Sequence, residues 1–302
     1  MSILRLFRGI GAPGGGRRVA ARFALLGGTL ALAVLLAVLV PRCIPSGTAS
    51  DGLQITSAAN VMTGHGDVLA LTARDTGAHE SPLRLVLVDP RRGTMLVAAP
   101  LAATAYRDPV ELADDGAEHV LLRSSNRAAL PELRDATTAA IVQTVPVVTT
   151  ALDAALTSSR VPGGAAEVAA LPDGRELRTR SRDGRSTIAV SKNGIAQSAP
   201  ATVFWNAAFL ADDRGALAAP DASGFFVASV DSLERSPRFL LTRLDPQGAP
   251  AWARLGTPDE ARAPRLLARV TGDAVVIVFA APASEVVAYD LGDGHVRWRV
   301  TP

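Results

Sequence analysis

The chain has 302 residues, of which 48 % are hydrophobic and 20 % charged, so it can build one or two folded domains and wholesale disorder is excluded. The formal net charge is +2, but the first 42 residues hold six arginines and no acid, which leaves 25 basic and 29 acidic residues beyond them. A mildly acidic main domain, without a basic block interleaved with aromatic residues, argues against nucleic acid as a partner. The single cysteine, Cys43, excludes an intramolecular disulfide and any multi-cysteine metal site.

The N-terminal region predicts a membrane anchor. Residues 1–22 form a basic tail, and residues 23–40, FALLGGTLALAVLLAVLV, contain no charge. A helix of about 18 to 20 residues crosses a bilayer core of roughly 30 Å. Five of the six arginines precede this run, so we expect a cytoplasmic N-terminus, a single pass through the cytoplasmic (inner) membrane, and a periplasmic or extracellular main domain. A secretory signal cleaved near residues 47–50 is the alternative. Residues 41–52 predict a linker.

Beyond residue 52 the sequence is typical of strands and turns. Short runs rich in Val, Leu, Ile and Ala are separated by Asp-Gly, Asn-Gly and Pro-Gly. The Asp-Gly of LPDGREL and the Asn-Gly of SKNGIAQ supply the positive φ that tight hairpins need. The runs predict strands at 67–73, 83–89, 93–99, 118–124, 186–191, 224–230, 238–245, 273–281 and 284–290.

One region departs from this pattern. Residues 126–160 are rich in Ala and also in β-branched residues, and they predict a small helical insertion in the β domain. We expect one helix around 130–142 and a second around 147–158, because Pro146 would interrupt a continuous helix.

Three hairpins share one layout, in which an apolar strand runs into Asp, Gly follows in the turn, and the next strand carries a large residue. An Asp side chain can accept hydrogen bonds from backbone amides and start a turn. We expect a recurring sheet unit in which each tryptophan fills the gap between neighbouring sheets. The structural repeat positions are Asp89 and Gly93, then Asp245, Gly248 and Trp252, then Asp290, Gly294 and Trp298.

This layout resembles the quinoprotein-type (PQQ-like repeat) β-propeller family, whose blades end in a D-x-x-T-G-x-x-x-W-like hairpin. Asp290 to Trp298 is the closest match, with Asp293 where the family often has Thr. The resemblance implies an all-β domain over residues 53–302, with degenerate propeller-like repeats of antiparallel sheets and about five or six blades of roughly 45 residues. A pair of β-sandwiches is the alternative. Family members that bind the quinone have an adjacent-cysteine disulfide and a metal-holding Glu/Asn/Asp set that this chain does not match, so no cofactor is expected.

Candidate chemistry is sparse. His65 and Asp67, in GHGD, could form a metal or acid–base site, although a solvated loop histidine is the favoured interpretation. No nucleotide-binding loop, hydrolase elbow or zinc-protease motif occurs. We therefore assign no catalytic, cofactor-binding or metal-binding residue. His79 and His295 are interpreted as loop or turn residues, and His119 falls in the strand predicted at 118–124. The runs Asp114-Asp115-Gly116 and Asp212-Asp213 could suggest calcium, but they lack the alternating carboxylates of a calcium loop and are interpreted as acidic turns.

Two functions from different classes are consistent with these features. The first is a non-catalytic scaffold or protein-binding module with a protein partner in the envelope. The second is an enzyme or solute-binding sensor with a site in the funnel of the propeller, to which His65 or His119 would contribute. An exposed apolar patch or open sheet edge would favour the first, and a cluster of polar residues converging with His65 or His119 would favour the second.

Overall fold

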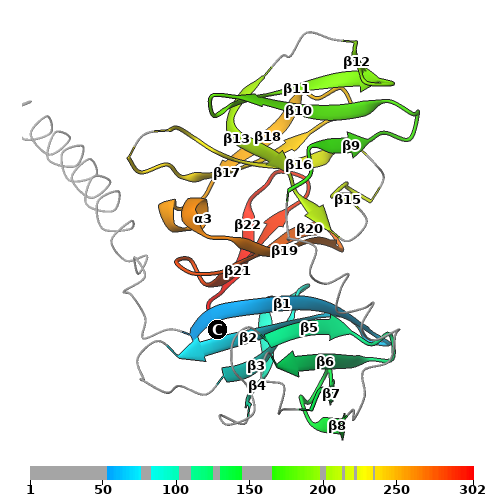
Figure 1. Ribbon diagram of the computed structural model, residues 1–302, viewed down its shortest axis with the longest axis vertical. Helices are drawn as coiled ribbons and strands as arrows, with labels where there is room; N and C mark the ends of the chain where they lie inside the picture. Colours follow the sequence, from blue (N-terminus) through cyan, green and yellow to red (C-terminus); the bar gives the residue numbers. More distant parts are fainter. Residues whose placement is uncertain are drawn as a thin grey trace, which may run out of the picture. The chain divides into compact units, whose positions relative to one another are not determined.

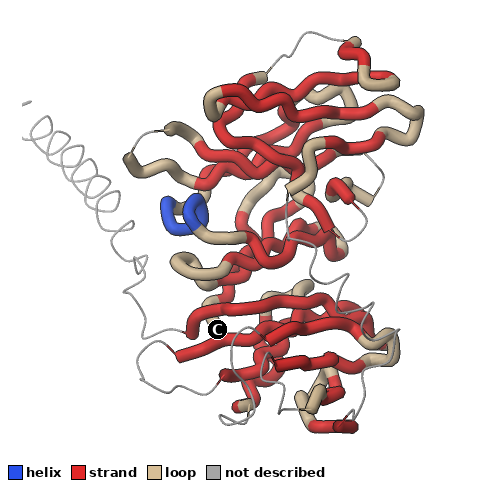
Figure 2. The backbone as a smooth tube through the Cα atoms, in the orientation of Figure 1, coloured by secondary structure: helices blue, strands red, loops and turns tan. Residues whose placement is uncertain are grey.

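The computed structural model describes most of the chain beyond residue 52, and this part is all-β with antiparallel sheets (Figures 1 and 2). The one helix among the described residues is α3 (Pro258–Arg262). Within those residues no helix has the length and apolarity to span a bilayer, and the predicted anchor at 23–40 lies outside them. The described residues are 53–75, 83–101, 110–124, 130–144, 165–197, 202–212, 215–220, 223–233 and 235–302.

Three of the sheets are four-stranded meanders, in which each strand pairs with the next along the chain. The first sheet contains β1 (Leu53–Thr63), β2 (Gly66–Asp75), β3 (Leu83–Asp89) and β4 (Thr94–Pro100). The second sheet contains β5 (Val110–Asp114), β6 (His119–Ser124), β7 (Glu132–Asp135) and β8 (Ile141–Thr144). The last sheet contains β19 (Arg265–Thr271), β20 (Ala274–Phe279), β21 (Glu285–Asp290) and β22 (Val296–Val300).

A fourth, long sheet lies between the second and last sheets in the sequence. Its strand order is β18-β17-β16-β13-β11-β10-β9, with β12 paired to β11. The strands are β9 (Val168–Ala170), β10 (Glu176–Arg182), β11 (Arg185–Lys192), β12 (Ile195–Ala196), β13 (Val203–Phe209), β16 (Phe225–Val230), β17 (Phe239–Leu244) and β18 (Pro250–Leu255). A separate two-stranded sheet pairs β14 (Ala211–Asp212) with β15 (Gly215–Ala216).

The inner strands of the first and last meanders are largely apolar on both faces, and the outer strands are not. All six residues of β20, AVVIVF, are buried, whereas β4 and β18 are half-exposed or exposed along their whole length. A strand buried on both sides has sheets above and below it, which explains the continuous apolar runs in the sequence.

Buried clusters identify the sheets that lie face to face. One cluster joins the first sheet to the last, through side chains that include Leu71 and Val276. Another joins the first sheet to the second, and a third joins the last sheet to β16 and β17. Figure 1 accordingly shows the last sheet between the first sheet and β16–β17. The chain's last sheet therefore packs on its first, which is how blades follow one another in a β-propeller.

The long sheet folds back on itself. Residues of β9, β10 and β11 share a buried cluster with β13 and β16, and a register shift in β13 falls between Trp205 and Ala208. Among the described residues, no buried cluster joins the second sheet to β9–β11. The outer face of β10 and β11 is consequently not covered by a neighbouring sheet in that part of the structure.

All nine predicted strands are confirmed as β2, β3, β4, β6, β11, β16, β17, β20 and β21. The predicted helix around 130–142 is wrong, because this segment forms the β7–β8 hairpin of the second sheet. The predicted second helix around 147–158 lies outside the described residues. Long-range pairing of β7 with β6 overrides the high helix propensity of the alanine-rich segment.

Candidate functional site

Each Asp–Gly repeat position closes the outer hairpin of a sheet. The carboxylate of Asp89 accepts a hydrogen bond from the amide of Arg91 at 2.8 Å, and the Gly93 amide donates to the Asp89 carbonyl at 2.8 Å. Asp290 and Gly294 repeat this arrangement in the β21–β22 turn. Asp245 and Gly248 form a turn that is one residue shorter. These carboxylates are occupied by backbone amides, so their role is to fix the hairpins.

A fourth copy of this turn lies at Asp135, inside the segment that the sequence predicted as helix. Its carboxylate accepts hydrogen bonds from the amides of Thr137 and Thr138 at 2.9 and 2.7 Å. Ala139, with φ of 57°, stands where the other turns have glycine, and its amide donates to the Asp135 carbonyl at 2.9 Å. Asp135 and Thr138 match the Asp-x-x-Thr of the resembled hairpin pattern, so the sequence did contain a sign of this turn.

The tryptophans link one sheet to the next. A Cβ atom on Gly93 of the first sheet would lie 2.5 Å from Cγ of Trp298 in the last sheet, and one on Gly294 of the last sheet would lie 2.6 Å from Cε3 of Trp252 in the long sheet. The Trp252 indole N–H also donates to the carbonyl of Leu291 at 3.0 Å. Each tryptophan thus covers the glycine turn of the following sheet, where no side chain fits.

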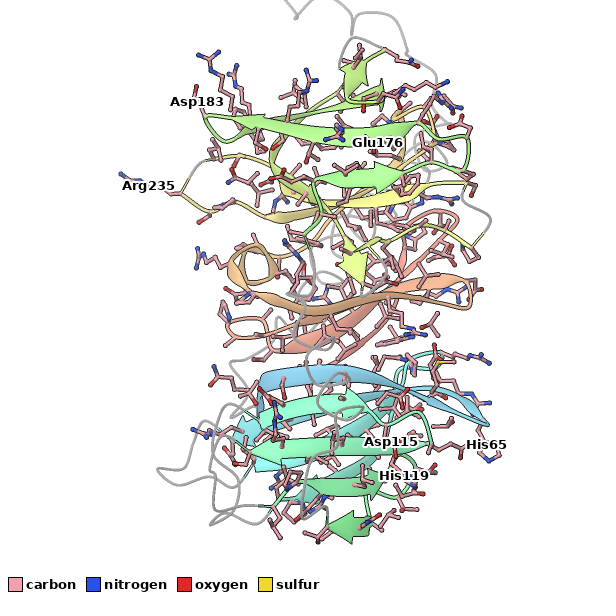
Figure 3. All side chains as sticks on the ribbon, turned by 45° about the vertical axis from the view of Figure 1, so that its right-hand side comes forward. His65, Asp115, His119, Glu176, Asp183 and Arg235 are labelled. Atoms are coloured by element: carbon pink, nitrogen blue, oxygen red, sulfur yellow. The ribbon has the colours of Figure 1, made fainter. Side chains whose placement is uncertain are left out.

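The structure does not bring the histidines together into a site. His65 is exposed on the β1–β2 turn and points outward in Figure 3, while His119 lies beside Asp115 with Nδ1 at 2.8 Å from the carboxylate. His295 is exposed in the β21–β22 turn near Asp293, and His79 lies outside the described residues. The described residues contain no group of histidine and acidic side chains that could hold a metal ion.

The acidic turns are engaged in local hydrogen bonds. Asp114 accepts from the amides of Met62 at 2.9 Å and Gly116 at 2.8 Å, which joins the second sheet to the first. Asp115 accepts from the amides of Ala117 and His119. Asp212 lies in β14, and Asp213 is outside the described residues.

A concentration of arginines on the long sheet is the most distinctive surface feature. Strand β10 carries Arg178, Arg180 and Arg182 at alternate positions, and Arg185 begins β11. The register pairs Arg180 with Thr187, Arg182 with Arg185, and Arg185 with Trp205 of β13. Directly opposed residues of antiparallel strands share a face, so these side chains lie on one side of the sheet. The arginines form no contiguous basic block in the sequence, and strand pairing alone brings Trp205 beside them.

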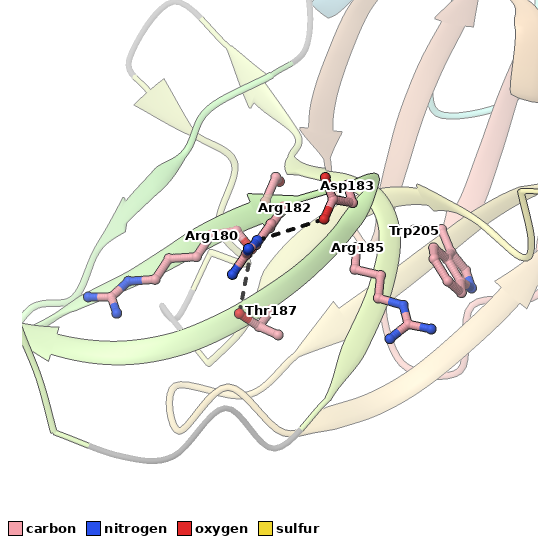
Figure 4. Close-up of a pocket in the computed structure, with 7 residues that line it drawn as sticks. Arg180, Arg182, Asp183, Arg185, Thr187 and Trp205 are labelled. Atoms are coloured by element: carbon pink, nitrogen blue, oxygen red, sulfur yellow. Dashed lines mark hydrogen bonds and ion pairs between the residues drawn. The ribbon is translucent and has the colours of Figure 1, made fainter.

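This surface, which we call the arginine face, is defined by Arg180, Arg182, Arg185, Thr187, Val203 and Trp205. Figure 4 shows Arg180, Arg182 and Arg185 projecting from the β10–β11 hairpin. Together with Ser181 and Asp183 they line a shallow pocket of about 640 Å³. The guanidinium of Arg185 lies 5.2 Å from the centre of the Trp205 ring, a cation–π distance. Arginine does not lose its proton near neutral pH, so this pocket is suited to binding anions and not to acid–base chemistry.

A second polar group is buried beside α3. Glu260 is fully buried and forms a capping box with Thr257, whose amide donates to Glu260 Oε2 at 2.7 Å. Arg299 of β22 lies 3.0 Å from Glu260 and 2.8 Å from Glu285. Burial raises the pKa of Glu285 to about 7, against the opposing attraction of Arg299 and with a further upward effect from Glu260. The group ties α3 to the last sheet, and its two carboxylates are buried.

The comparisons with known proteins identify no family. No family model matches the chain, and no curated protein matches it. It is similar to solved β-propeller structures: BamB from Moraxella catarrhalis has 13 % identity over 82 % of this chain and 77 % of that one, with a TM-score of 0.22. The Dos1 propeller has 12 % identity over 84 % and 73 % of the two chains, with a TM-score of 0.31. The propeller-type architecture is inferred from the strand order and the packing of the sheets, not from these TM-scores.

Proposed function

We propose that the chain is a membrane-anchored, extracytoplasmic protein-binding module without catalytic activity. The arginine face is the observation that supports this function most. It combines exposed Arg180 and Arg182 with half-buried Trp205 and exposed Val203, and arginine and tryptophan are the residues most enriched where proteins bind one another. No second sheet covers it among the described residues.

The chemistry of the site supports a binding role. The arginine face offers donors and fixed positive charge, while Glu285, whose pKa is raised by burial, lies in β21 with its side chain 9 % exposed and paired with Arg299. A catalytic site needs a titrating group within reach of the substrate. The pocket beside Arg185 contains Ser181, Thr187 and Asp183 but no histidine.

The membrane location follows from the sequence. Residues 23–40 would span the cytoplasmic membrane with the N-terminus inside, so that residues 53–302 face the periplasm or the exterior. The repeated Asp turns, with tryptophans seated on glycines, support a degenerate quinoprotein-type propeller without its cofactor. In this account the sheets are a rigid scaffold, and the surface of the long sheet carries the function.

Recovery of a partner from membranes tests the proposal. Cells producing the tagged full-length protein are crosslinked, and the protein is purified alongside His65→Ala and His119→Ala variants. We expect one dominant protein partner in near-equal amount, recovered equally with both variants. Absence of a protein partner, together with a bound small molecule that either variant loses, would contradict the proposal and establish a sensor or enzyme instead.

A further inference from the structure

We propose that the arginine face binds an extended acidic segment of a protein partner, with the carboxylates at alternate residues. This inference rests on the proposed function and specifies its partner. Four observations support it: the ion pairs of the arginines, their spacing along the strand, the contact of Arg185 with the Trp205 ring, and the net charge of the surrounding domain.

Within the part of the chain that the structure describes, the arginines of this face are less engaged by acidic side chains than their neighbours are. Arg175 and Arg178 lie 2.7 Å from the carboxylates of Asp173 and Glu176. Arg180 and Arg185 form no ion pair with any described acid, and Arg182 comes no nearer than 3.7 Å to Asp183, with both side chains at least 90 % exposed. Guanidinium groups bind carboxylates through paired, charge-assisted hydrogen bonds. The guanidinium groups of Arg180 and Arg185 are therefore available to an external acid, and that of Arg182 has only a long, solvent-exposed contact with Asp183 to exchange.

The spacing selects the shape of the ligand. Arg180 and Arg182 are alternate residues of one strand, so their Cα atoms lie roughly 6.6 to 6.8 Å apart. An extended polypeptide repeats its side chains with the same period. Acidic residues at every second position would meet Arg180 and Arg182 in succession, and Arg185 opposite Arg182 extends the contact onto β11.

The aromatic residue argues against a nucleic acid as the anion. Single-stranded nucleic acids bind by stacking bases on exposed aromatic faces. Trp205 is the aromatic residue of this surface, and the Arg185 guanidinium already lies over its ring at 5.2 Å. Val203, 59 % exposed and paired with Thr187, adds an apolar contact beside the charges that a side chain of a peptide can use.

The charge of the domain directs the ligand to this face. Beyond residue 42 the chain has 25 basic and 29 acidic residues, so an acidic segment is repelled by the domain as a whole. The three arginines Arg180, Arg182 and Arg185 create a local excess of positive charge on this hairpin, which favours binding of the acidic segment there.

The test is fluorescence anisotropy with a labelled twelve-residue peptide of alternating Glu and Thr, titrated with the purified full-length protein. We expect saturable binding that weakens with added salt. The Arg180→Gln/Arg185→Gln variant should raise Kd by about tenfold or more, since it removes two charge-assisted contacts. The matched control is Arg175→Gln/Arg238→Gln, which removes the same charge from residues already paired with Asp173 and Asp231. It should change Kd by less than about twofold.

Three results would overturn the inference. The first is equal weakening by both double variants, which would indicate attraction by net charge alone. The second is tighter binding of an oligo-dT strand or of phosphatidylglycerol vesicles than of the peptide. The third is a membrane partner that the Arg180→Gln/Arg185→Gln protein still recovers, which would leave the proposed function intact and place its surface elsewhere. Failure to recover a partner even with the unmodified protein would instead refute the proposed function.

Discussion

Replacing Gly93 by alanine tests whether Trp298 of the last sheet is seated on the turn of the first. Gly93 has φ of 66°, and a Cβ there would lie 2.5 Å from Cγ and 2.7 Å from Cε3 of the indole. Carbon atoms pack at about 3.5 to 4.0 Å, so the ring would have to move by an ångström or more. The substitution combines backbone strain with a steric clash.

The two contributions can be separated. A left-handed conformation costs an alanine about 1–2 kcal/mol, and overpacking of a well-packed contact costs about 1–3 kcal/mol. Gly174, with φ of 78° and no atom within 4 Å of its Cβ position, has only the first contribution. We therefore expect Gly93→Ala to lower the free energy of unfolding by about 2–5 kcal/mol and Gly174→Ala by about 1–2 kcal/mol.

A double variant sharpens the test. The first sheet has Val97 where the hairpin pattern expects tryptophan, and Val97 packs on the cluster that contains Ala139 of the next turn. Gly93→Ala combined with Trp298→Val copies this smaller pairing. In the Trp298→Val background, Gly93→Ala should therefore lower the free energy of unfolding by at least about 1 kcal/mol less than it does in the unmodified protein. Urea unfolding of the purified full-length protein measures the free energy of unfolding of the unmodified protein, of each single variant and of the double variant. Equal costs for Gly93→Ala and Gly174→Ala, or strict additivity in the double variant, would refute the reasoning.

Four further results are expected. Burial raises the pKa of Glu285 to about 7 from an ordinary 4.5, so the unfolding free energy should fall as pH rises from 4.5 to about 7, and Glu285→Gln should flatten the urea midpoints over this range. Asp135→Ala removes three hydrogen bonds and should cost about 1–3 kcal/mol in the same assay, whereas a cost below about 0.5 kcal/mol would contradict the turn. Trp252→Phe loses a buried hydrogen bond and about 1 kcal/mol, while Trp205→Phe should leave stability within about 0.5 kcal/mol. Cys43 should react with a membrane-impermeant maleimide in intact cells, and labelling only after lysis would reverse the proposed orientation.

The sequence was most informative where local chemistry and burial agree. Apolar runs such as 273–281 mark strands with sheets on both faces, and Asp-x-x-x-Gly marks the turn that follows them. It failed at the β7–β8 hairpin, where Ala139 takes the place of glycine and the surrounding residues have high helix propensity. Asp135 followed by Thr138 was the remaining sign of a turn, and tertiary pairing decided the outcome.

The arginine face could not be predicted from spacing along the chain. Arg180 and Arg182 alternate with Ser181, so they do not form a contiguous basic block. Trp205 is distant in sequence and reaches Arg185 only through the pairing of β11 with β13. The register between β11 and β13 is a property of the folded sheet. The sequence therefore indicated the strands but not the arginine face that we propose as the binding surface.

Site-specific photocrosslinking tests the central claim most directly. A photoreactive residue is placed at Thr187, within the arginine face, and in a second protein at Met62, which is 52 % exposed on β1 of the first sheet. Both full-length proteins are illuminated in living cells. We predict a discrete protein adduct from position 187 that is absent from position 62 and is lost with Arg180→Gln/Arg185→Gln. No adduct at 187, or the same adduct from both positions, would contradict the claim that this face binds a protein partner.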